Sequence, residues 1–147
     1  TTWLADAVVE ARFGNPYATT EGEWSSGFML RRSGPTRLHF IGITHVDGLG
    51  YWHHHVGSGT SGEHTLVQSL YSRHIETSPT GSNSLRVIAL ANECWLFING
   101  AYVAELDLSG WSAAGQINIY TNFWASDGIA GKSTEFDGFV VWSVGDE

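Results

Sequence analysis

The run of three histidines at positions 53 to 55 is the most unusual polar feature of the 147-residue sequence. In a strand, alternate side chains point to opposite faces, so His53 and His55 share one face and His54 points to the other. Two imidazoles on one face could hold zinc if a neighbouring strand supplied a third ligand, such as His39 or His45. No spacing in the sequence fixes that third ligand. Solvated or hydrogen-bonded histidines are therefore the favoured interpretation, and no metal or other cofactor is predicted.

Aromatic residues beside polar side chains indicate a second kind of chemistry, the binding of sugars. Sugar rings present apolar C–H faces and hydroxyl rims, so their sites combine a flat aromatic ring with amide, carboxylate, guanidinium or imidazole groups. Several of the seven tryptophans lie at expected strand ends or in loops next to such groups. The predicted ligand-binding residues are Trp24 with Arg31, His39, Trp52 with His54, and Trp124 with Asn122 and Asp127.

Two carboxylates could support hydrolysis of a glycosidic bond. Glu105 and Asp107 are two residues apart, so in a strand they share a face at a spacing of about 7 Å. Glycoside hydrolysis usually requires two carboxylates roughly 5 to 9.5 Å apart. Acidic residues solvated at a strand end are the more ordinary interpretation of this pair, and no catalytic residue is predicted.

Composition and charge narrow the classes of partner. The formal net charge of −8, from 15 acidic and 7 basic residues, disfavours nucleic acid and anionic membrane surfaces. The single Cys94 lies in an apolar run, which predicts a buried, inert thiol and excludes an intrachain disulfide. No apolar run approaches the ~20 residues of a spanning helix, and no signal peptide is recognised. The start at Thr1 without methionine is consistent with a domain excised from a larger chain.

The elements that must position these side chains are strands, and a β-hairpin is the strongest of them. Asn99-Gly100 lies between two apolar runs, and both residues tolerate the positive φ of a two-residue type I′ turn. Counting from the turn gives the pairs Ile98/Ala101, Phe97/Tyr102, Leu96/Val103 and Trp95/Ala104. One face then carries Trp95, Phe97, Tyr102 and Leu106. The other face is apolar too, so the aromatic face is either covered or binds something.

Alternation of apolar and polar residues predicts the remaining strands. They span residues 7–13, 24–31, 37–46, 51–56, 65–71, 85–91, 116–122 and 134–144. The polar segment 72–84 is expected to be a crossover connection, and strand 85–91 is expected to form a meander with the hairpin. With no 3.6-residue period, about ten short strands predict an all-β fold, a two-sheet antiparallel β-sandwich of jelly-roll type. Residues 1–147 are expected to form one domain.

Three groups of residues carry a resemblance to a known superfamily. They are Trp24-x-x-Gly27-Phe28-x-x-Arg31, the strand Leu85-Arg86-Val87 leading into Leu96-Phe97-Ile98-Asn99-Gly100-x-x-Val103-Ala104, and Phe136-x-x-Phe139-x-Val141-Trp142. Together they resemble the concanavalin A-like lectin/glucanase superfamily, which includes laminin-G-like and carbohydrate-binding jelly-roll modules. The resemblance covers nearly the whole chain and implies that Leu96, Ile98 and Val103 pack between sheets. It also favours an extracellular or cell-surface location.

The same resemblance bears on function. Glucanases of the superfamily carry Glu-x-Asp-x-x-Glu, and here Glu105-Leu106-Asp107-Leu108-Ser109-Gly110 lacks the last carboxylate. The sequence is therefore interpreted as a non-catalytic binding module, with carbohydrate as the expected partner. Two alternatives remain: a protein-interaction or sensory module of a multidomain protein, and a glycoside hydrolase that uses Glu105 and Asp107.

Overall fold

The computed structural model describes residues 3–18, 20–59, 64–123 and 131–145. Within these ranges the regular structure is ten β-strands. The strands are β1 (Ala7–Gly14), β2 (Trp24–Arg32), β3 (Arg37–Val46), β4 (Leu49–Ser58), β5 (Thr65–Tyr71), β6 (Ser82–Leu90), β7 (Glu93–Ile98), β8 (Ala101–Asp107), β9 (Gln116–Phe123) and β10 (Phe136–Ser143). No helix long and apolar enough to cross a membrane occurs in this part of the chain.

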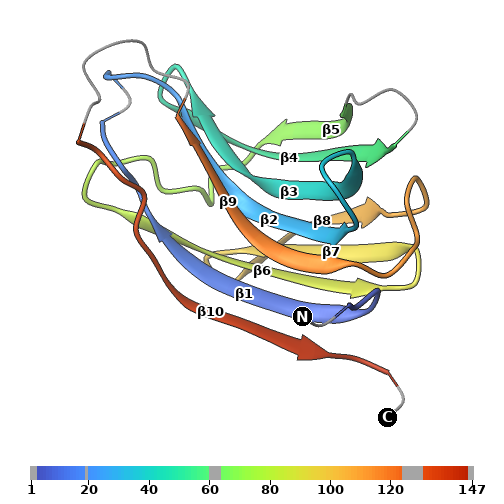
Figure 1. The fold of residues 1–147 in the computed structure, drawn as a ribbon. Helices are drawn as coiled ribbons and strands as arrows, with labels where there is room; N and C mark the ends of the chain where they lie inside the picture. Colours follow the sequence, from blue (N-terminus) through green and yellow to red (C-terminus); the bar gives the residue numbers. More distant parts are fainter. Residues whose placement is uncertain (1–2, 19, 60–63, 124–130, 146–147) are drawn as a thin grey trace.

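The strands form two five-stranded antiparallel sheets that pack face to face (Figure 1). Sheet I has the order β10-β1-β6-β7-β8, and sheet II has the order β5-β4-β3-β2-β9. The polar segment after β5 carries the chain from sheet II to sheet I, as the sequence predicts for a crossover. Strands β6, β7 and β8 form the expected meander, and the predicted two-sheet sandwich is confirmed.

Alternation along each strand explains where the core lies. Sheet I contributes one face of β1, β6 and β7, with Val9, Val87 and Leu96 fully buried. Sheet II contributes the facing side of β2 and β3, with Phe28 and Ile41 fully buried. Removing this apolar surface from water is the main force that holds the two sheets together. Cys94 belongs to the same core, where burial raises the pKa of its thiol to about 12, in agreement with an inert cysteine.

The hairpin at Asn99 and Gly100 forms with the predicted turn, because both residues have positive φ, 52° and 84°. The predicted register is correct for the first two pairs, up to Phe97 opposite Tyr102, and wrong beyond them. A β-bulge at Val103 shifts the pairing, so Leu96 lies opposite Ala104 instead of Val103. The bulge turns Leu106 toward the core, where it is 3% exposed, away from the aromatic face to which the sequence assigned it.

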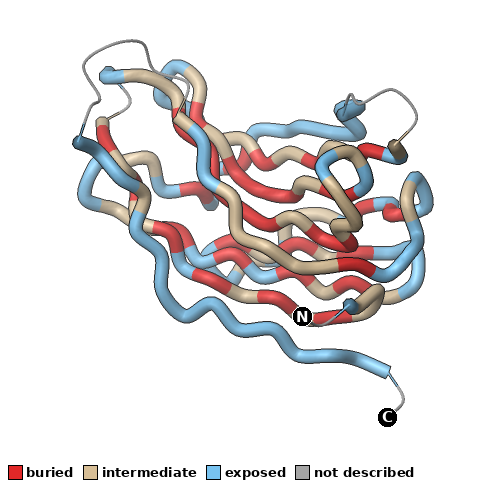
Figure 2. Tube along the Cα trace, viewed as in Figure 1, coloured by how far each residue is buried: buried red, intermediate tan, exposed pale blue. Residues whose placement is uncertain are grey.

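The resemblance assigned three side chains of this hairpin to packing between the sheets. Leu96 and Ile98 are fully buried there, while Val103, at the bulge, is partly buried against the core. The opposite face is not covered by described residues: Trp95 and Phe97 are half-buried, and Tyr102 is 55% exposed. The edge strand β10 is exposed along its whole length (Figure 2).

Candidate functional site

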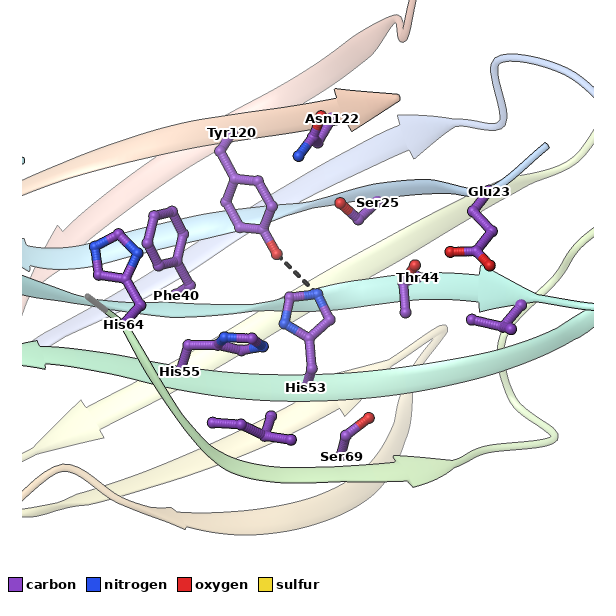
Figure 3. Close-up of a pocket in the computed structure, with 12 residues that line it drawn as sticks. Glu23, Ser25, Phe40, Thr44, His53, His55, His64, Ser69, Tyr120 and Asn122 are labelled. Atoms are coloured by element: carbon purple, nitrogen blue, oxygen red, sulfur yellow. Dashed lines mark hydrogen bonds between the residues drawn. The ribbon is translucent and has the colours of Figure 1, made fainter. Parts of the chain in front are cut away.

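A cavity of about 500 Å³ lies on the outer face of sheet II, the face turned away from sheet I (Figure 3). Such a volume falls within the range of small-molecule sites. The lining combines aromatic rings, imidazoles, hydroxyls, one amide and one carboxylate. The residues are Glu23, Ser25, Phe40, Thr44, Val46, His53, His55, His64, Leu66, Ser69, Tyr120 and Asn122.

Strand alternation places these side chains together. On β3 the buried Ile41 and Ile43 face sheet I, so Phe40 and Thr44 face outward into the cavity. On β4 the same alternation turns His53 and His55 outward together, and the sequence predicts that these two side chains share a face. Cross-strand pairing of Phe40 with His55 then brings the two strands' outward rows side by side.

A pair of glycines makes room at the floor of the cavity. Gly27 of β2 and Gly42 of β3 lie directly opposite each other in the sheet. A Cβ atom on Gly42 would overlap the Tyr120 hydroxyl and the main-chain oxygen of Ser26. The absent side chains therefore let the ring of Tyr120 extend from β9 over β2 and β3.

The side chain of Tyr120 reaches His53 and so links β9 to β4. Its hydroxyl lies 3.0 Å from Nε2 of His53, the contact drawn as a dashed line in Figure 3. Burial raises the pKa of Tyr120. Burial and the neighbouring His55 together lower the pKa of His53 to about 4. At neutral pH the phenol is thus protonated and the imidazole uncharged, so the hydroxyl can donate to Nε2. Tyr120 and His53 therefore form an uncharged pair of rings that is held in place by this hydrogen bond.

Five of the eight predicted ligand-binding residues lie on the core side of sheet II. Trp24 and Arg31 are each 1% exposed, Trp52 is 2% exposed, and His39 and His54 are fully buried. A stacking platform for a sugar needs an exposed ring face, a condition that neither tryptophan meets. The core position follows from strand parity, which turns Trp52 and His54 away from His53 and His55.

Three of these buried side chains, Arg31, His39 and His54, have hydrogen-bond partners within the fold. Arg31, at a positive φ of 53°, turns inward and donates to the main-chain oxygens of Ala5, at 3.0 Å, and of Ala91. Nδ1 of His39 lies 2.9 Å from Nε2 of His54, and Nε2 of His39 lies 2.7 Å from the carbonyl oxygen of Trp111. Since a carbonyl only accepts, His39 donates from Nε2 and accepts at Nδ1, which fixes the tautomers of both rings.

Of the other predicted site residues, Asn122 does line the cavity. Trp124 and Asp127 lie outside the described residues. The histidines proposed as third zinc ligands, His39 and His45, are buried on the core face, opposite to His53 and His55. Among the described residues, no three His, Cys, Asp or Glu side chains are arranged to hold a metal ion.

The carboxylates considered for hydrolysis are not part of this cavity. Glu105 and Asp107 are exposed on β8, at an edge of sheet I, and neither lines the cavity. The main-chain N–H of Ser109 donates to Asp107 at 2.9 Å and holds the pKa of this carboxyl below its usual value. A general acid for glycoside cleavage needs the opposite shift.

Sequence reasoning missed most of the cavity, above all Glu23, Phe40, His64 and Tyr120. The signal was present in the strand pattern: outward positions of β2, β3, β4 and β9 carry aromatic and polar side chains on the face opposite the buried one. Grouping these outward positions across strands requires the strand order, which the sequence does not provide. The sequence-based prediction centred on tryptophans, and most of the residues that it chose therefore lie on the core face.

Known structures with the same fold include a carbohydrate-binding module, galectins and a glycoside hydrolase. The carbohydrate-binding module CBM66 from Bacillus subtilis is 11% identical, with a TM-score of 0.66 over 97% of this chain and 78% of that chain. Sheep galectin-11, in complex with glycerol, is 11% identical, with a TM-score of 0.54 over 92% of each chain. A family 16 endo-glucanase from Bacteroides ovatus is 12% identical, with a TM-score of 0.62 over 92% of this chain and 67% of that chain.

At these identities the similarity establishes the fold alone. The chain has the concanavalin A-like jelly-roll fold that the sequence resemblance predicts. No protein-family model and no curated protein sequence matches the chain.

Proposed function

We propose that the chain is a non-catalytic carbohydrate-binding module whose ligand site is the cavity on the outer face of sheet II. The observation that carries the proposal is the mixture of groups in one concave space: the rings of Phe40 and Tyr120 beside hydroxyls, imidazoles and the Asn122 amide. Aromatic faces complement the C–H faces of a sugar, and the polar groups complement its hydroxyl rim. The carbohydrate-binding module among the structures with this fold supports the same interpretation.

The absence of a suitable acid pair supports a binding role. Among the described residues, Glu23 is the one carboxylate that lines the cavity. Hydrolysis by the usual routes needs a second carboxyl group across the bound sugar. Glu105 and Asp107 remain the residues of the alternative hydrolase, and a protein partner remains the other alternative.

The direct test is a glycan array followed by calorimetric titration of the best oligosaccharide. Phe40→Ala and Asn122→Ala should each weaken binding by about tenfold, because each removes a ring face or a polar contact to the sugar. Phe136→Ala is the matched control: it removes an aromatic ring that is 52% exposed on β10 of sheet I, and binding should not change.

Two outcomes would contradict the proposal. If no oligosaccharide binds while the protein remains folded, the carbohydrate-binding function is wrong. If a chromogenic glycoside is cleaved and Glu105→Gln abolishes the cleavage, the hydrolase alternative replaces it.

A further inference from the structure

We propose that the cavity takes an amino sugar, a glycan unit that bears a free, protonated amine, in preference to a neutral or acidic sugar. This inference rests on the proposed carbohydrate-binding function and specifies its ligand class. Three independent features carry it: the absence of Arg and Lys from the cavity lining, the position of Glu23, and the surrounding aromatic rings.

All seven Arg and Lys residues of the chain are outside the cavity lining. Each of them lies in the described ranges, because residues 1–2, 19, 60–63, 124–130 and 146–147 contain neither Arg nor Lys. Arg12, Arg86 and Arg31 lie within ion-pair distance of Asp137, Glu10 and Asp6, respectively, at 2.8, 3.5 and 3.7 Å. An acidic sugar would therefore meet no counter-charge from Arg or Lys here, within a protein of net charge −8.

Glu23 supplies a negative charge to the cavity. Its main chain is held in place because the Tyr17 hydroxyl donates to the Glu23 carbonyl oxygen. Its carboxylate has no ion-pair partner among the described residues and lies beside Thr44 at one end of the cavity (Figure 3). An unpaired carboxylate next to hydroxyl acceptors suits a primary ammonium, which offers three donors and no acceptor.

Aromatic rings line the rest of the cavity. Phe40 packs edge to face with Tyr120, their centroids 5.3 Å apart, and with His64, at 4.7 Å. The ring of His53 lies 5.2 Å from that of His55. Ring faces attract a cation, provided that the imidazoles themselves are uncharged. Burial keeps the pKa of both His53 and His55 below the usual value, so these two rings favour the neutral form.

The ligand class is tested by titration with four tetrasaccharides at pH 6, where an amine is protonated. The set comprises a β-1,4-glucosamine tetramer, its fully N-acetylated form, cellotetraose and tetragalacturonate. The glucosamine tetramer should bind about tenfold or more tightly than the acetylated form, which has the same backbone without the charge.

Two variants separate the cavity charge from the overall charge. Glu23→Gln should remove the preference for the free amine while retaining binding of the acetylated tetramer. Glu93→Gln is the control, because it changes the net charge by the same amount at an exposed position on sheet I, and the preference should persist. Thermal unfolding of each variant establishes that the comparison is made between folded proteins.

The outcomes distinguish this inference from the function on which it rests. Equal affinity for the acetylated and free-amine tetramers, or tightest binding of tetragalacturonate, overturns the amino-sugar inference and leaves carbohydrate binding intact. Loss of the preference in Glu93→Gln as well as in Glu23→Gln also overturns it. Binding of none of the four, together with an empty glycan array, overturns both.

Discussion

Gly42 is the residue on which the geometry of the cavity depends most directly. It lies in the middle of β3, opposite Gly27. The hydroxyl of Tyr120 occupies the space that a side chain at this position would need. Glycine inside a strand weakens the strand, so its presence at two facing positions needs a packing reason. The reach of Tyr120 to His53 supplies that reason.

We expect Gly42→Ala to destabilise the protein by about 1–3 kcal/mol, because the added methyl group meets a main-chain oxygen that cannot move away. The same methyl group should displace Tyr120 and weaken ligand binding. Urea unfolding measures the first effect, and titration with an oligosaccharide measures the second.

Gly14→Ala is the control for this substitution. The nearest described atom to a Cβ on Gly14 is the main-chain oxygen of Glu135, 3.7 Å away, which is an ordinary contact. A stability change below about 1 kcal/mol is expected. If Gly42→Ala is as well tolerated as Gly14→Ala, the close approach of Tyr120 does not exist in solution.

Residue types alone do not reveal which face of a strand meets ligand. In 52–55 the sequence correctly separates His53 and His55 from Trp52 and His54, because strand alternation is fixed by backbone geometry. Both sets contain rings that can pack or bind. Which set enters the core is decided by the opposite sheet, through contacts with residues far away in the chain.

At the scale of elements, the β-bulge in β8 decides which side chains of the hairpin enter the core. Two residues of β8 face one residue of β7 at this point, so every position after Val103 changes face. Leu106 thereby joins Cys94 in the core, while Tyr102, before the bulge, stays exposed.

Because of the bulge, we expect alanine substitutions at Leu106 and at Tyr102 to change the free energy of unfolding by different amounts. Leu106→Ala should lower the free energy of unfolding by about 2–4 kcal/mol, since it opens a cavity in the core. Tyr102→Ala should lower it by less than about 1 kcal/mol, because its ring is mostly in water. Urea unfolding of both variants provides the comparison. Similar costs for the two truncations would mean that the unbulged register, with both side chains on one face, is the one adopted.

Strand positions could be predicted from the sequence because alternation and turn residues are local signals. The turn at Asn99 and Gly100 and the first two pairs of the hairpin follow from these signals. The bulge at Val103 does not, since Val103, Ala104 and Leu106 are all apolar and either register buries some of them. Burial against sheet II selects the register that also hides Leu106.

At the scale of the whole molecule, the sandwich buries histidines in its core. His39, His45 and His54 are all fully buried, and burial lowers the pKa of each. For His54, where the charge of His39 adds to the effect of burial, the pKa falls to about 3. The two-sheet architecture itself was predictable, but the burial of three imidazoles was not, because it depends on how the sheets face each other.

These histidines make the stability of the fold depend on pH in a defined direction. Each is neutral when folded and has a pKa near 6.5 when unfolded, so below pH 6.5 the unfolded chain binds more protons. Stability is therefore complete above pH 6.5 and decreases as the pH falls toward the folded pKa. For His54 alone the loss between pH 6.5 and 5 is about 2 kcal/mol, and His39 and His45 act in the same direction.

The midpoints of urea unfolding at pH 7.5, 6.5, 5.5 and 5 measure this dependence. In this pH range imidazoles titrate and most carboxylates do not, so the two contributions can be separated. The carboxyls with lowered pKa, Asp107, Asp137 and Glu76, lose their stabilising charge mainly as the pH falls below about 4.5, where the unfolded chain takes up protons at these groups.

The double variant His39→Leu/His54→Leu removes both partners of the buried pair and should make the curve above pH 5 less steep. His45, His53 and His55, whose pKa values burial also lowers, should maintain the remaining slope. If the midpoint of urea unfolding stays constant from pH 7.5 to 5 in the unmodified protein, these imidazoles are solvated. In that case the core face of sheet II is open to water.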